Sequence, residues 1–100
     1  MAKAAEKKTA KGKPVIVRTY SAGVHFGYLA AKNGKEVSLT GSRRIWYWKG
    51  ANTLSEIALR GVGAGSKIAE RVNLVLTEAI EIIDCTKEAA LNLEAAVWQG

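Results

Sequence analysis

The sequence is short of several residue types, and each shortage excludes a class of protein. Cys85 is the only cysteine of the 100 residues, so no disulfide can form within one chain, which suits a reducing compartment. No apolar run approaches the roughly 18 residues that are needed to cross a bilayer. The lysines near the N-terminus are not followed by an apolar segment, so no secretory signal is predicted. We therefore expect no contact with a membrane.

Histidine is equally scarce, and the chain shows no catalytic or metal-binding pattern. His25 is the only histidine, and no Cys/His spacing supplies partners for a metal ion. It fits a packed strand histidine better than a general base, and contact with a ligand stays open. Glu78 and Glu81, three apart in an expected strand, point to opposite faces, which favours solvated carboxylates over an acid–base pair. Cys85 has no neighbouring cation and is interpreted as a buried apolar residue. We therefore expect that the protein is not an enzyme and that it binds neither a metal ion nor a cofactor.

Positive charge is present but unevenly spread. The chain carries a net charge of +6, and residues 1–13 hold five lysines and one glutamate, a net charge of +4. The rest of the chain therefore carries only +2, which is weak support for a basic nucleic-acid face. We expect residues 1–13 to be a disordered basic tail that makes at most weak contact with nucleic acid. Residues 14–100 are expected to form a single α+β domain.

Apolar periodicity predicts a small antiparallel sheet of about five strands with two short helices. Asn33-Gly34 is the strongest turn signal and predicts a hairpin. Thr53 and Glu56 form a capping box, which predicts a helix that Gly61 ends. A strand break is expected at Gly41-Ser42, and residues 61–66 are interpreted as a glycine-rich loop without the lysine of a phosphate-binding loop. The expected strands are 15–20, 24–31, 36–40, 71–76 and 78–83, and the last helix is expected from residue 87, capped by Thr86, to about residue 97.

The most distinctive stretch is Ser42-Arg-Arg-Ile-Trp-Tyr-Trp-Lys49, which holds three of the seven aromatic residues next to cations. Strand alternation separates Arg44, Trp46 and Trp48 from Arg43, Ile45 and Tyr47. Guanidinium groups bind phosphate and indole rings stack on bases, while a core or subunit contact for the tryptophans stays open. The candidate ligand-binding residues are Arg18, His25, Arg43, Arg44, Trp46, Trp48 and Lys49.

Three blocks of sequence resemble a family of small proteins of tailed bacteriophages and prophages. They are Val17-Arg-Thr-Tyr-Ser-Ala-Gly-Val-His25, Arg43-Arg-Ile-Trp-Tyr-Trp-Lys-Gly-Ala51 with Thr53-Leu54-Ser55, and Leu76-Thr-Glu-Ala-Ile-Glu-Ile-Ile83. The resemblance covers about residues 14–88 and leaves out the tail and the 61–66 loop. That family has no defined function. The resemblance implies a location in the host cytoplasm and a non-enzymatic accessory role.

Three functions compete on these observations. The favoured one is a phage accessory protein that binds a partner through its Arg/Trp-rich face, such as a nucleotide-like small molecule of host defence. It predicts a concave pocket that contains those residues. The second is a nucleic-acid-binding accessory protein, for which binding should weaken steeply with salt. The third is a virion or protein-interaction module with a large apolar contact patch. Exposed tryptophans in a small domain also lead us to expect a homo-oligomer.

Overall fold

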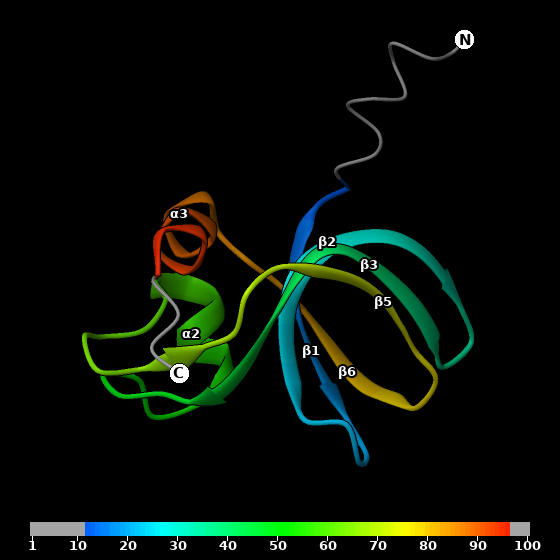
Figure 1. The fold of residues 1–100 in the computed structure, drawn as a ribbon, viewed down its shortest axis with the longest axis horizontal. Helices are drawn as coiled ribbons and strands as arrows, with labels where there is room; N and C mark the ends of the chain where they lie inside the picture. The colour runs from blue at the N-terminus through cyan, green and yellow to red at the C-terminus, as the bar shows by residue number, and fades with distance from the viewer. Residues whose placement is uncertain (1–11, 97–100) are drawn as a thin grey trace, which may run out of the picture.

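In the computed structural model, which describes residues 12–96, six strands form one antiparallel sheet with two helices packed beside it (Figure 1). The elements in chain order are β1 (Pro14–Thr19), β2 (Val24–Asn33), β3 (Glu36–Tyr47), α2 (Leu54–Arg60), β4 (Lys67–Ile68), β5 (Val72–Leu76), β6 (Ala79–Asp84) and α3 (Lys87–Ala95). The strand order is β4-β3-β2-β1-β6, and β5 also pairs with β3. The predicted α+β class is confirmed.

The sheet is strongly curled, and the connection between β5 and β6 explains why. Only Thr77 and Glu78 separate these strands, yet β5 pairs with β3 and β6 pairs with β1. Because β2 lies between β3 and β1, the sheet has to bend until its two sides meet at this turn (Figure 1). The backbone oxygen of Lys35 accepts the N–H of Ala79 at 3.1 Å, so the β2–β3 turn also joins this meeting point.

Two apolar clusters lie on the two faces of the curled sheet. The inner cluster, enclosed by strands, consists of Val15, Val17, Val37, Leu39 and Leu76. The outer cluster lies between the sheet and the helices and consists of Ile16, Phe26, Ile45, Ile57, Ala58, Ile68, Ala90 and Leu93. Strand β1 contributes side chains to both clusters, because Val15 and Val17 face inward and Ile16 faces the helices. All three are fully buried, as expected for a strand covered on both faces.

Helix α2 begins and ends where its capping residues predict. The hydroxyl oxygen of Thr53 accepts the N–H of Glu56 at 3.2 Å, and Gly61 ends the helix with a φ of 87°. The capping box is modified, because the Glu56 carboxylate accepts the N–H of Asn52 at 3.0 Å. The residues that indicate this helix therefore lie within it or next to it in the sequence. Its apolar residues Ile57 and Ala58 are buried, as expected.

Helix α3 begins with the predicted cap and is tied directly to α2. The Thr86 hydroxyl accepts the N–H of Ala89 at 3.0 Å and donates to the backbone oxygen of Leu59 at 2.7 Å. Ala89, Ala90 and Leu93 are buried. The helix ends at residue 95, short of the expected 97. Residues 1–11 of the expected tail, and the last residues from 97 onward, lie outside the described part of the chain.

The strand predictions need three corrections. β3 runs through Gly41 without the expected break, because Gly41 takes a φ of 57° and the register shifts there. The hairpin after β2 is confirmed, but its two-residue loop is Gly34-Lys35, since Asn33 pairs with Glu36. β4 was not predicted because two residues carry no periodicity. Residues 61–66 form neither helix nor strand, as expected.

Candidate functional site

Trp46 and Tyr47 are both exposed at a β-bulge near the end of β3. Ile45 pairs with Ile68 and Tyr47 pairs with Lys67, so Trp46 is the extra residue between two consecutive residues of β4. Trp46 continues the alternation that exposes Arg44 and buries Ile45, and the bulge re-aims Tyr47, which that alternation alone would bury. The side chain of Trp46 is 49% exposed and that of Tyr47 is 44% exposed. The structure therefore presents two aromatic rings to solvent at this edge of the sheet.

One cation lies over the exposed indole, and two more are close to it in the chain. The Nζ atom of Lys67 lies 5.7 Å from the centroid of the Trp46 ring, a cation–π arrangement. Arg44 lies two residues before Trp46 along β3, with an exposed side chain. Lys49 is exposed too, while its backbone N–H donates to the Ser66 hydroxyl at 2.9 Å. We call these five residues, Arg44, Trp46, Tyr47, Lys49 and Lys67, the Trp46 surface.

Within residues 12–96, no carboxylate forms an ion pair with the cations of the Trp46 surface. The ion pairs within residues 12–96 join Lys13 to Asp84, Arg18 to Glu81, Arg60 to Glu56 and Arg71 to Glu94. Within that part of the chain, Arg44, Lys49 and Lys67 form no ion pair. The surface therefore keeps a local positive charge that can attract an anionic ligand.

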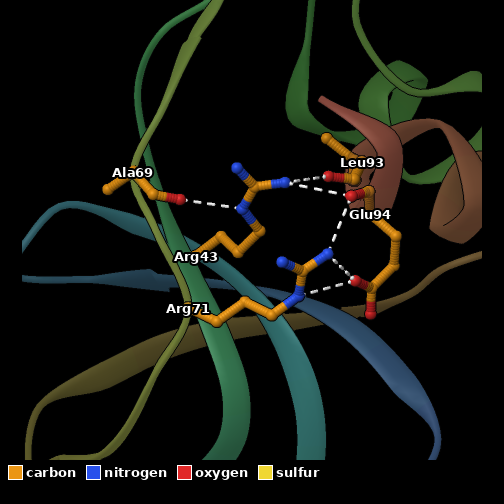
Figure 2. A network of polar contacts seen from close by, with 5 residues as sticks. All are labelled: Arg43, Ala69, Arg71, Leu93 and Glu94. Atoms are coloured by element: carbon orange, nitrogen blue, oxygen red, sulfur yellow. Dashed lines mark hydrogen bonds and ion pairs between the residues drawn. The ribbon is translucent and has the colours of Figure 1, made fainter. Parts of the chain in front are cut away.

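Arg43 points away from this surface and holds α3 against the sheet (Figure 2). Its side chain is only 2% exposed. Its Nε–H donates to the backbone oxygen of Ala69 at 2.7 Å, and Nη1 donates to the backbone oxygens of Leu93 at 2.9 Å and Glu94 at 3.2 Å. Burial and the charge of Arg71 lower the pKa of Arg43, whereas Glu94 raises it. The Arg43 guanidinium is thus engaged within the fold.

Arg71 completes the same network from the start of β5. Its Nη2 donates to the backbone oxygen of Glu94 at 2.8 Å, and its Nε donates to the Glu94 carboxylate at 2.9 Å (Figure 2). The last turn of α3 contains no basic residue of its own. Because the carbonyls at a helix C-terminus lack partners within the helix and carry partial negative charge, two arginines from other elements supply both donors and positive charge.

Two other predicted ligand residues, Arg18 and Trp48, also lie away from the Trp46 surface. Arg18 pairs with Glu81 at 3.1 Å and stands beside Val24 in the sheet, on the face of the outer cluster. Trp48 packs against that outer cluster, because β3 ends at Tyr47 and strand alternation stops there. The structure therefore brings together Arg44, Trp46 and Lys49 and separates them from Arg18, Arg43 and Trp48.

His25 lies beneath the sheet surface, opposite Arg44 in the register of β2 and β3. It is 1% exposed, and its Nε2–H donates to the backbone oxygen of Ala22 at 2.9 Å. Burial lowers the pKa of His25, the Ala22 bond opposes this, and the nearby Arg44 charge lowers it further. The ring is therefore neutral at pH 7 and is not accessible to a ligand.

Cys85 and the carboxylates form no reactive arrangement in the described residues. Burial, and then the charge of Asp84, raise the pKa of the Cys85 thiol to about 12, so it packs as an apolar group. No three His, Cys, Asp or Glu side chains within residues 12–96 gather as metal ligands do.

Two members of the Trp46 surface, Tyr47 and Lys67, were missed from the sequence. Tyr47 was assigned by alternation to the face opposite Trp46, and a bulge breaks that alternation. Lys67 follows the glycine-rich loop and reaches Trp46 only because β4 pairs with β3. An exposed aromatic run beside a short loop was the only available signal for either residue.

Two hollows lie elsewhere on the described surface. One of about 710 Å³ is bounded by β6 and the β2–β3 turn, and one of about 410 Å³ lies between residues 62–66 and α3. Neither is lined by a residue of the Trp46 surface. The concave pocket that a small-molecule site predicts around the arginines and tryptophans is therefore neither of these two hollows.

Fold and site together define a small α+β domain with an open cationic and aromatic surface. Residues 12–93 match a family described as a domain of unknown function (DUF6948), and the chain belongs to this family. No match was found among curated proteins or among solved structures. None of the helices in residues 12–96 has the length and apolar character to cross a membrane.

Proposed function

We propose that this chain is a non-enzymatic accessory protein that binds single-stranded nucleic acid through the Trp46 surface. The observation that carries the proposal is the half-exposed indole of Trp46, which Lys67 approaches on a surface whose cations form no ion pair within residues 12–96. A monomeric domain gains nothing for its core from turning a tryptophan outward. A ligand that stacks on the ring accounts for this arrangement.

Stacking and charge act on different parts of such a ligand. An unstacked base can lie on the Trp46 ring, and this contact is worth about 1–3 kcal/mol. Lys67 lies over the ring, and the exposed side chains of Arg44 and Lys49 come from the same end of β3, so these cations are available to a sugar–phosphate backbone. Bases inside a duplex are already stacked and are not available to an aromatic side chain, which favours single strands.

The open shape of the surface favours a polymer over a small nucleotide. Sites for small molecules usually enclose most of the ligand. A mononucleotide on the Trp46 surface of one chain would keep one face of its base in water. A strand gains further contacts with each nucleotide, including contacts with the lysines of residues 1–13.

The biological setting is part of the proposal. The resemblance to proteins of tailed phages and prophages favours a role in the cytoplasm of an infected or lysogenic bacterium. A phage produces single-stranded intermediates during replication and transcription, and an accessory protein that binds them requires no catalytic residues.

Fluorescence anisotropy with a labelled oligo(dT) and an oligo(U) tests the proposal. We expect binding at low salt that weakens as salt rises, with a slope of about 0.7 per phosphate contact. Trp46→Ala should weaken binding by about 5–150-fold, which corresponds to the energy of one stacked base. Arg44→Ala should lower the salt slope by about one phosphate contact.

Tyr20→Ala is the matched control, because Tyr20 is an aromatic residue that is 79% exposed outside the Trp46 surface. Deletion of residues 1–11 separates the charge of the tail from the surface, and the Trp46→Ala effect should persist in the shortened chain. The proposal fails if the wild-type chain does not bind at low salt or if the two aromatic variants bind alike. A mononucleotide that competes as well as the oligomer would also overturn it, in favour of a small-molecule site.

A further inference from the structure

The larger hollow runs along a strand with a free edge. Four consecutive residues of β6, numbers 79–82, line it on one side. Lys32, Gly34 and Lys35 of the β2–β3 turn line the other side, and Tyr20 lines it as well. With a volume of about 710 Å³ it is an elongated groove beside the strand. Ile80 and Tyr20, at 53% and 79% exposed, leave apolar surface in it uncovered.

Unpaired backbone groups face this groove. β6 pairs only with β1 among the strands of residues 12–96. The N–H of Cys85 donates to the backbone oxygen of Pro14 at 3.0 Å, so the alternation of an antiparallel ladder turns the groups of Ile83 and Glu81 toward β1. The N–H and C=O groups of Ile82, which lines the groove, and of Asp84, at the end of β6, then point away from β1, whereas the N–H of Ala79 at the other end already donates to the backbone oxygen of Lys35. The groups of Ile82 and Asp84 offer an added strand the hydrogen bonds of a sheet edge.

The charges around the groove specify what kind of strand fits. Lys32 and Lys35 are exposed and form no ion pair within residues 12–96. Of the two glutamates of the groove, Glu81 is paired with Arg18 at 3.1 Å and Glu78 accepts from the Ser21 hydroxyl at 3.2 Å. The groove therefore favours an extended segment that combines apolar side chains with carboxylates.

β6 itself has this chemistry. The segment Glu78–Asp84 contains three isoleucines and three carboxylates, and residues 72–86 contain no lysine or arginine. Edge strands of monomeric proteins are usually protected by lysine, proline or a β-bulge; β6 has no lysine or proline, and its bulge at Ile80 leaves the pairing of Glu81 to Asp84 regular. Two antiparallel copies of such a strand form a self-complementary contact, as a two-fold dimer requires.

The geometry points to a second copy of this chain as the occupant of the groove. The β6 strands of the two copies pair antiparallel, which joins two curled sheets into one continuous sheet. Lys32 and Lys35 of each copy face carboxylates of the partner's β6 segment, and Ile80 and Tyr20 become buried at the contact. This interface is separate from the Trp46 surface and does not rest on the proposed nucleic-acid binding.

Sedimentation velocity over a concentration series tests the inference with the full chain. The wild-type protein should shift from a mass of 10.7 kDa to twice that mass as concentration rises. Ile80→Lys, which places a cation on the edge strand, should abolish the dimer. Lys32→Glu combined with Lys35→Glu should raise the dimer dissociation constant about tenfold, and added salt should weaken the wild-type dimer.

Two matched variants place the same lysine on other exposed apolar positions. Leu91→Lys lies on α3 and Val75→Lys lies on β5, at side chains that are 65% and 52% exposed, and both should leave the dimer intact. Circular dichroism confirms that each variant is folded. The inference is overturned if the wild-type chain stays monomeric or if Ile80→Lys dimerises normally. A monomer that binds a synthetic peptide of residues 77–84, but not a scrambled one, would overturn self-association and identify the groove as a site for another protein's strand.

Discussion

Replacing Arg43 with methionine tests the network that joins the sheet to α3. Methionine fills a similar volume without a donor, so the backbone oxygens of Ala69 and Leu93 lose their hydrogen bonds, whereas that of Glu94 keeps the bond from Arg71. Each carbonyl left buried without a donor costs about 1–2 kcal/mol, giving about 2–4 kcal/mol for the two. The variant also avoids the cost of burying the guanidinium charge, which offsets about 1 kcal/mol of this destabilisation.

We therefore expect Arg43→Met to lower the free energy of unfolding by about 1–3 kcal/mol. For a domain of this size, the midpoint of thermal unfolding should fall by roughly 5–20 °C. The stability of Arg43→Lys should lie between those of the wild type and Arg43→Met, because a single ammonium group cannot reach Ala69 and Leu93 at once as the guanidinium group does. Urea unfolding followed by circular dichroism measures each difference.

Arg44→Met provides the matched control, since the same side chain is removed from the next position. Arg44 is exposed, and its loss should change stability by no more than about 0.5 kcal/mol. Arg43→Met should also leave nucleic-acid binding unchanged under conditions in which it is folded. If the two variants unfold at the same urea concentration, the polar network of Figure 2 does not stabilise the fold and the reasoning is refuted.

Two further predictions concern the inner face of the sheet. Gly27→Ala should destabilise the protein by about 1–3 kcal/mol, because its Cβ would lie 3.1 Å from the Cα of Ser42 and would have to displace backbone; an unchanged urea midpoint would contradict this close approach. His25 has a lowered pKa in the folded chain, so between that pKa and 6.5 the unfolded chain binds more protons. Stability should therefore be complete above pH 6.5 and decline as pH falls through this window, by at most about 1.4 kcal/mol per pH unit. Urea midpoints measured from pH 5 to 8 should show this decline, and a His25→Gln variant should lack it; an identical pH profile in both proteins would contradict the assignment.

Local chemistry made several elements predictable. Thr53, Thr86 and Gly61 begin or end helices through bonds to residues three or four positions away, so the sequence contains both partners. Gly27 was expected to mark a bulge or a close approach, and the structure shows both, with a register shift at Gly27 and Leu39 nearby. These signals act over a few residues, which is the range that sequence patterns describe.

The candidate site was only partly predictable. Alternation correctly separated Arg43 from Arg44, but it could not indicate which arginine would be buried. That choice depends on the carbonyl of Leu93, fifty residues later in the chain, which α3 brings to β3. Likewise, alternation placed Trp46 and Trp48 on the same face; Trp46 is exposed beside Arg44, as alternation predicts, whereas the end of β3 lets Trp48 pack on the core.

Short-range hydrogen bonds and apolar periodicity specify the α+β class, the hairpin and the helix caps, so these could be predicted from the amino-acid sequence. The stretch from residue 42 to 49 could also be identified as the distinctive one, because its aromatic and cationic residues are adjacent in the chain. The curl of the sheet, the pairing of β4 with β3 and the roles of the individual arginines became visible only in the folded chain. Each of these depends on contacts between residues far apart in sequence, and such contacts leave no periodic pattern in the chain.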